Sequence, residues 1–227
     1  MKKVRFLLLI MTLALMMSGV GYAAWSESLS INSIIRTGEL DVRFVEDTTG
    51  QGGRGSEYVI PSMRIVDKNE KSHKVEVSLD NMYPGSWAMF KIKGVNSGTI
   101  PAKFEKVKVE FSGDKNLLSY LTFQAGVSID TDGDGKFDKV SDFKGALSDL
   151  ESLFNKSIEN ELKNTAMNPK NSGTFVLGVP FEKANDIEKK GIKDDYIIIR
   201  MDEKAPNDLK QKILNFNLDI SFKQFNK

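Results

Sequence analysis

The chain has 227 residues, with 32 lysines and arginines against 31 aspartates and glutamates, one histidine and no cysteine. This near-neutral balance, without a basic stripe or interleaved aromatic residues, argues against a nucleic-acid partner. The lack of cysteine excludes disulfides and cysteine nucleophiles, and a chain of this length can bury enough apolar surface to fold without cross-links.

The N-terminal segment has the layout of a secretory signal peptide. Three basic residues among the first five precede an uncharged, Leu- and Met-rich run from residue 6 to residue 17. Gly21 and Ala23 are small residues three and one positions before a potential cut, so we expect a signal peptidase to cleave between Ala23 and Ala24. The alternative is a retained membrane anchor, because residues 6–25 form an uncharged stretch just long enough to cross a bilayer as a helix.

Alternating apolar and polar residues predict several half-buried strands in the first half of the chain. The strands predicted in this way are 40–44, 75–79, 90–93 and 107–111. In the first of them, the alternation places Asp41 on the solvent face. The turn residues Asn96, Ser97 and Gly98 lie between the last two strands and predict a hairpin.

Two further features that would suggest catalysis are weak. Gly50, Gly52 and Gly55 match a dinucleotide-binding fingerprint, but the residues after them read as extended chain and not as a helix, which predicts a flexible surface loop. His73, the one histidine, stands at a strand end beside lysines and is expected to be an exposed residue with no catalytic part.

A loop after the predicted strand 121–129 has the spacing of a calcium-binding loop. The candidate ligands are the carboxylates of Asp130, Asp132, Asp134 and Asp138 and the carbonyl of Lys136. Gly135 permits the sharp turn, but Ser141 stands where the EF-hand loop has a bidentate glutamate. The alternative is an acidic turn whose aspartates bond backbone N–H groups. We expect calcium, because four carboxylates this close repel one another without a cation.

One segment has helical periodicity. Apolar residues recur at spacings of three and four between Phe143 and Leu162, which predicts an amphipathic helix over about residues 142–165. Asp142 is one candidate for its N-cap, and Ser148 with Glu151 in a capping box is another. We expect this helix to follow the calcium loop directly.

The last third of the chain returns to strands. Residues 175–181 and 196–199 are continuously apolar, which predicts strands buried on both faces or covered by another element. Residues 214–222 alternate strictly, so one face is expected in the core and the other in solvent. The sequence therefore predicts a mainly β protein: a signal peptide over residues 1–23, then a single domain over 24–227 with a jelly-roll-like antiparallel β-sandwich and one inserted helix.

Four segments in order resemble the TasA/camelysin (CalY) family, whose members are secreted subunits of biofilm matrix fibres in Gram-positive bacteria. They are Ala24-Trp25-Ser26-Glu27, the stretch from Thr37 to Val42, the stretch from Met82 to Ser86, and the stretch from Asn96 to Ala102. The resemblance covers about residues 1–112. It implies a jelly-roll sandwich, cleavage by a signal peptidase of the SipW type, and an extracellular filament built from copies of the chain with matrix proteins or polysaccharide as further partners.

The resemblance also implies donor-strand complementation, in which the segment after the cleavage site completes a sheet of the next subunit. Here that segment is Ala24 to about Ile35, with Trp25, Leu29 and Ile31 as its main apolar side chains. Leu29 and Ile31 alternate with polar residues, which is compatible with an added strand. The alternative is an ordinary first strand folded into its own domain.

Some members of this family carry a metalloendopeptidase label, and a calcium-dependent adhesion or sugar-binding module is a third possibility. With one histidine, no HExxH motif and no cysteine, a zinc centre is difficult to build. The best candidate metal site is all oxygen, which suits calcium and not catalytic zinc. We therefore expect a structural subunit and not an enzyme.

Overall fold

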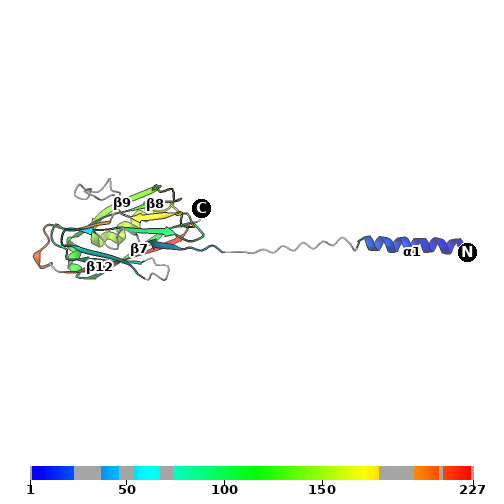
Figure 1. Ribbon diagram of the computed structural model, residues 1–227, viewed down its shortest axis with the longest axis horizontal. Coiled ribbons are helices and arrows are strands. Elements are labelled where there is room, and N and C mark those ends of the chain that lie inside the picture. The colour runs from blue at the N-terminus through cyan, green and yellow to red at the C-terminus, as the bar shows by residue number, and fades with distance from the viewer. Residues whose placement is uncertain are drawn as a thin grey trace. The chain divides into compact units, whose positions relative to one another are not determined.

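A computed structural model describes residues 2–22, 37–45, 54–66, 74–178, 197–209 and 212–225. The chain divides into two units, Met1–Thr37 and Gly38–Lys227. The first contains helix α1 (Lys2–Tyr22) (Figure 1). Its side chains are exposed as far as residue 17. Among the residues just given, no helix is both long and apolar enough to cross a membrane. The predicted cleavage and donor-strand residues lie outside the described part of the chain: Ala23, Ala24, Trp25, Leu29 and Ile31.

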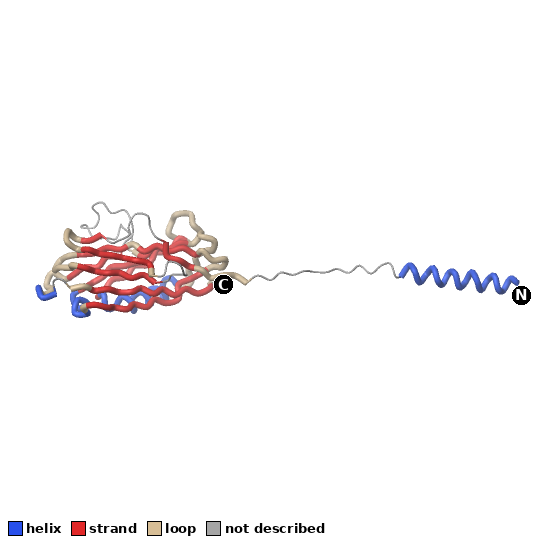
Figure 2. The backbone as a smooth tube through the Cα atoms, turned by 60° about the horizontal axis from the view of Figure 1, so that its bottom comes forward, coloured by secondary structure: helices blue, strands red, loops and turns tan. Residues whose placement is uncertain are grey.

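The second unit is a sandwich of two antiparallel sheets, whose strands are red in Figure 2. β8 and β9 belong to one layer and β7 and β12 to the other (Figure 1). The larger sheet contains β1 (Val42–Val45), β2 (Arg54–Gly55), β5 (Trp87–Phe90), β6 (Ile92–Asn96), β8 (Leu121–Asp130), β9 (Lys139–Ala146), β10 (Thr174–Leu177) and β11 (Ile197–Met201). The smaller sheet contains β3 (Ile60–Ile65), β4 (Lys74–Asp80), β7 (Ala102–Gly113) and β12 (Leu214–Gln224). The chain crosses repeatedly between the sheets, and the predicted jelly-roll-like sandwich is confirmed.

The larger sheet is built in rows. On one edge β8 pairs with β9, and on its other edge it pairs with β10 through residues 127–130 and with β11 through residues 121–124. β10 and β11 pair in turn with β6 and β5, which only Lys91 separates. β10 and β11 therefore lie end to end in one central row. Successive residues in both strands are buried, at 175–177 and at 197–199, as their continuously apolar sequences predict.

The smaller sheet shows the predicted alternation. In β12 the apolar residues of one parity are buried, from Leu214 to Phe222, and in β4 Val75, Val77 and Leu79 are buried. The predicted hairpin is wrong, however, because β6 belongs to the larger sheet and β7 to the smaller one. Alternation shows that one face of a strand is buried, but it does not identify the strand's partner.

The inserted helix begins later than predicted. Residues 139–146 form β9, and the helical segment comprises a 3-10 turn η2 (Leu147–Asp149), α2 (Leu150–Ser157) and a π-helical turn η3 (Ile158–Leu162). Asp142 therefore lies in a strand and caps no helix, and Ser148 makes no capping bond. Glu151 instead accepts a hydrogen bond from the backbone of β7. Further 3-10 turns are η1 (Lys115–Tyr120) and η5 (Asn207–Leu209).

Phe175 joins the two layers. Its side chain is fully buried, and its ring lies 5.0 Å from that of Phe104 in β7 and 5.6 Å from that of Phe222 in β12, measured between centroids. Gly94 in β6 makes room for the ring, because a Cβ at this position would lie 2.2 Å from an atom of Phe175. The core of the sandwich is therefore packed across both sheets at this point.

Asp41 does not face solvent as predicted. It is 3 % exposed, and its Oδ2 accepts a hydrogen bond from Arg43 Nε at 2.8 Å and another from the same guanidinium. Its backbone oxygen accepts hydrogen bonds from Ser97 and Gly98, so the residue lies beneath the turn after β6. β1 begins only at Val42, and alternation does not apply to the residue before it.

Candidate functional site

The acidic loop forms the tip of the hairpin between β8 and β9. These two strands pair in register from Thr122–Ala146 to Ile129–Lys139. The loop therefore joins two strands, and the predicted strand-to-helix junction is wrong. Ser141, at the position of the EF-hand glutamate, is buried in β9, and its hydroxyl lies 2.5 Å from that of Ser157.

Three of the four predicted carboxylates converge. Asp130, Asp132 and Asp138 each have a carboxylate oxygen within 4.8 Å of the others. The carboxylate of Asp134 is not in this group: its Oδ1 accepts a hydrogen bond from the Lys136 N–H, and its Oδ2 lies 3.8 Å from Lys136 Nζ. An all-oxygen group of this kind suits a hard divalent cation such as calcium.

Hydrogen bonds within the loop orient the carboxylates. Asp130, which is buried, accepts hydrogen bonds from the N–H groups of Gly133 at 2.6 Å and Gly135 at 2.9 Å. Asp138 Oδ2 accepts from the backbone and the hydroxyl of Thr131, and these bonds lower the pKa of Asp138. An acidic turn without a metal would have the same bonds. Among the described residues, none donates to Asp132 Oδ2 or Asp138 Oδ1, so both oxygens have lone pairs for a cation.

The loop is also attached to the segment before β10. The N–H of Asn168 donates to the carbonyl of Thr131 at 2.9 Å. Gly133 has a φ of +83°, and a Cβ there would lie 2.8 Å from the carbonyl oxygen of Ser172. Gly135 has a φ of +85°, as the predicted sharp turn requires. The loop therefore lies against residues 168–172, in addition to being held by its own hydrogen bonds.

We expect calcium to stabilise the folded protein through this loop. A ligand that binds only the folded state at a hundredfold excess over Kd contributes about 2.7 kcal/mol, or roughly 5–10 °C in melting temperature for a chain of this size. Differential scanning calorimetry in chelator and in millimolar calcium measures the shift.

The matched variants are Asp132→Asn and Asp134→Asn. Asparagine at position 132 keeps an oxygen that can accept from the Asp134 N–H but removes one of the three converging charges, so the calcium-dependent shift should be largely lost. Asp134→Asn removes a charge outside that group and should keep most of the shift. Equal melting curves with and without calcium in the wild type would show that the loop is only an acidic turn.

Two of the four resemblance segments meet at the start of the domain. The Thr99 N–H donates to the Glu39 carbonyl at 2.8 Å, and the Glu39 N–H donates to the Thr99 hydroxyl at 2.7 Å. The fully buried Asn96 holds the turn, because its amide donates to the carbonyls of Ile100 and Met167, each at 2.9 Å. The chain is therefore firmly attached where it enters the domain after residue 37.

On the outer edge of β3, outward backbone groups have no hydrogen-bond partner among the described residues. The Val66 N–H donates to the Lys74 carbonyl, so in the pair of β3 with β4 the even-numbered residues bond β4 and the odd-numbered ones point outward. Pro61 is one of these outward residues and has no N–H. No described residue accepts a hydrogen bond from the N–H of Met63 or Ile65.

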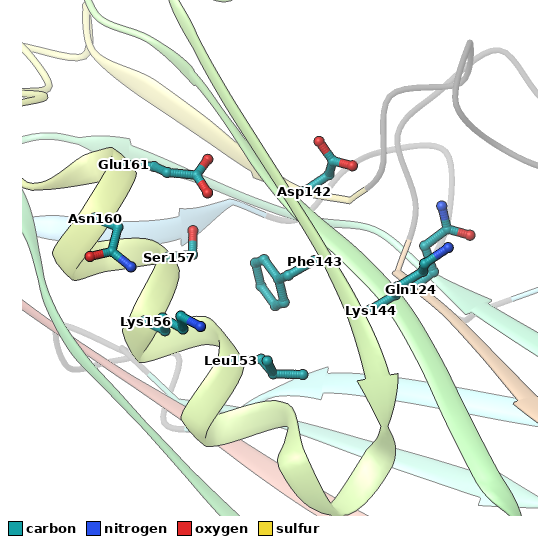
Figure 3. A pocket seen from close by; sticks show the side chains of 9 residues that line it. All are labelled: Gln124, Asp142, Phe143, Lys144, Leu153, Lys156, Ser157, Asn160 and Glu161. Carbon is teal, nitrogen blue, oxygen red and sulfur yellow. The ribbon is translucent and has the colours of Figure 1, made fainter.

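A pocket of about 500 Å³ lies between β9 and α2 (Figure 3). Phe143 points from β9 toward the helix, and Leu153 gives the pocket a second apolar wall. Its remaining lining is polar and of mixed charge, including Asp142, Lys144 and Glu161. None of the described residues that line it is a histidine, so they supply neither the histidine ligands of a catalytic zinc nor the histidine base of a serine triad.

The other predicted features do not add to a site. Gly50, Gly52 and His73 lie outside the described residues, and Gly55 ends the short strand β2, after which the chain makes a turn and enters β3. No helix follows it, as a dinucleotide site would require. The sequence did not predict that the polar side chains of Asn96, Glu151 and Asn155 form hydrogen bonds with distant backbone groups.

No protein-family model matches the chain, and no curated protein matches it. One similar solved structure is the family 11 carbohydrate-binding module from Clostridium thermocellum in complex with a beta-1,3-1,4-mixed-linked tetrasaccharide. It is 15 % identical, and the match covers 82 % of this chain and 95 % of that one with a TM-score of 0.28. A TM-score this low does not establish a shared fold, so the architecture rests on the strand pairing given above.

Proposed function

We propose that the protein is a structural subunit of extracellular filaments. Residues 24–35 of one copy add as a strand to a sheet of the next copy, after export and cleavage between Ala23 and Ala24 by a signal peptidase of the SipW type. Further copies, matrix proteins or polysaccharide are its partners at the surface of a Gram-positive bacterium, and a calcium ion in the loop between β8 and β9 stabilises each subunit.

The observation that carries the proposal is the open outer edge of β3. An edge with unpaired N–H groups accepts an extended segment through backbone hydrogen bonds, and alternate side chains then give specificity. The segment from Ala24 to Ile35 precedes the domain, and Leu29 and Ile31 supply alternating apolar side chains. A head-to-tail contact of this kind does not close, so it continues into a fibre.

Negative-stain electron microscopy of protein purified with Ala24 as its first residue tests the proposal. Fibres that lengthen with protein concentration are expected. Monomers at every concentration, together with retention of a carbohydrate ligand, would favour a binding module instead.

We expect no peptidase activity from the purified protein. The chain has one histidine and no cysteine, and the converging ligands in the described part are all carboxylates. Casein incubated with the protein and zinc should remain intact in gel electrophoresis. Cleavage that disappears both with chelator and in the His73→Ala variant would favour a metallopeptidase over a filament subunit.

A further inference from the structure

The outer edge of β7 is closed by side chains of α2. β7 pairs with β12 along its whole length, from Ala102 to Gly113, so its other side is one of the two outer edges of the smaller sheet, opposite that of β3. A long edge strand of this kind invites pairing with another chain unless something covers it.

Asn155 takes the place of a residue in a neighbouring strand. Its Oδ1 accepts from the Val107 N–H at 2.8 Å, and its Nδ2 donates to the Val107 carbonyl at 2.8 Å. One turn earlier in α2, Glu151 Oε2 accepts from the Val109 N–H at 2.9 Å. At the start of β7, Ala102 exchanges two backbone hydrogen bonds with Met167, of 3.1 and 2.8 Å. Partners therefore occupy outward backbone groups of Ala102, Val107 and Val109 on this edge.

The helix is held in this position by its other contacts. Phe154 is buried and its ring lies 5.1 Å from that of Phe143 in β9 and 6.5 Å from that of Phe104 in β7, between centroids. Leu150 and Leu162 are also buried, and Leu153 and Ser157 lie on the side of the helix that faces Phe143 (Figure 3). α2 thus packs between one edge strand of each sheet, β9 in the larger and β7 in the smaller.

We infer that α2 blocks the addition of another strand at the outer edge of β7. Asn155 and Glu151 occupy backbone groups of β7 that a neighbouring strand would otherwise bond. Self-association through the smaller sheet is thereby directed away from β7. This closure holds whether or not the protein forms filaments.

The test uses the Asn155→Ala, Glu151→Ala double variant of the mature chain. Leu29→Asp and Ile31→Asp are added so that any assembly through the N-terminal segment is removed. Hydrogen exchange should show at least tenfold faster exchange of the Val107 and Val109 amides, and sedimentation velocity should show new, concentration-dependent oligomers. Adding Val109→Pro should reduce this association, because proline leaves no outward N–H at the centre of the edge.

The matched control is Glu159→Ala with Asn160→Ala, which removes the same residue types from exposed positions of the same helical segment. It should remain monomeric with unchanged exchange. If the double variant does not fold, Glu151→Ala alone should speed exchange at Val109 and leave Val107 protected by Asn155. A folded variant that stays monomeric with unchanged exchange at Val107 and Val109 would overturn the inference, as would equal association in the control.

Discussion

Protein that starts at Ala24 and carries Leu29→Asp with Ile31→Asp is expected to form no fibres while keeping its β-structure. Both positions belong to the segment proposed to add to a neighbouring copy, and both share one parity, so they enter the same face of the acceptor sheet. Burying an unpaired carboxylate costs several kcal/mol, so two of them prevent the strand from docking. Microscopy measures fibres, and circular dichroism measures the fold.

The matched control is Ser28→Asp with Ser30→Asp. It makes the same change of charge on the opposite face of the strand, which is expected to remain in solvent, and it should form fibres. A chain lacking residues 24–35 should remain a folded monomer and bind an added peptide of that sequence. Normal fibres from either the Leu29 and Ile31 variant or the truncated chain would show that another surface carries the assembly.

Phe175→Ala should destabilise the domain by about 3–5 kcal/mol, the range for removing a fully buried aromatic side chain. The ring touches both sheets, so its loss leaves a cavity between them that neither sheet can close alone. Gly94 on the neighbouring strand has no side chain to fill the space. Urea denaturation followed by circular dichroism measures the change.

Phe137→Ala makes the same chemical change at an exposed position and is the control. Its side chain is 45 % exposed, so the free energy of unfolding in chelator should stay within about 0.5 kcal/mol of the wild type. A cost below about 1 kcal/mol for Phe175→Ala would show that the sheets are not packed through this ring.

The error in the helix start has a simple geometric cause. Phe143 and Leu147 are four residues apart, and positions four apart share a face in a strand as well as in a helix. Periodicity therefore could not decide between the two. The pairing of residues 139–146 with β8 decided it. The spacing of apolar residues does not show whether a segment has a strand to pair with.

The sequence by itself determined the local features of this protein. Strict alternation over residues 214–222 identified a strand with one buried face, and aspartates at every second position with a following glycine identified the acidic loop. Each of these signals is set by neighbours in the chain, because side-chain direction in a strand and backbone conformation in a turn are local properties.

Only the tertiary structure decided which distant groups meet. It placed β6 and β7 in different sheets, brought Asp138 but not Asp134 to Asp130, and set Asn155 against Val107. A polar residue on a helix reads as a solvent-facing one from sequence, because nothing within a few positions shows that an unpaired strand edge lies beside it. Buried polar groups need hydrogen-bond partners, and in the folded chain these partners come from distant segments. Local propensity does not show which segments they are.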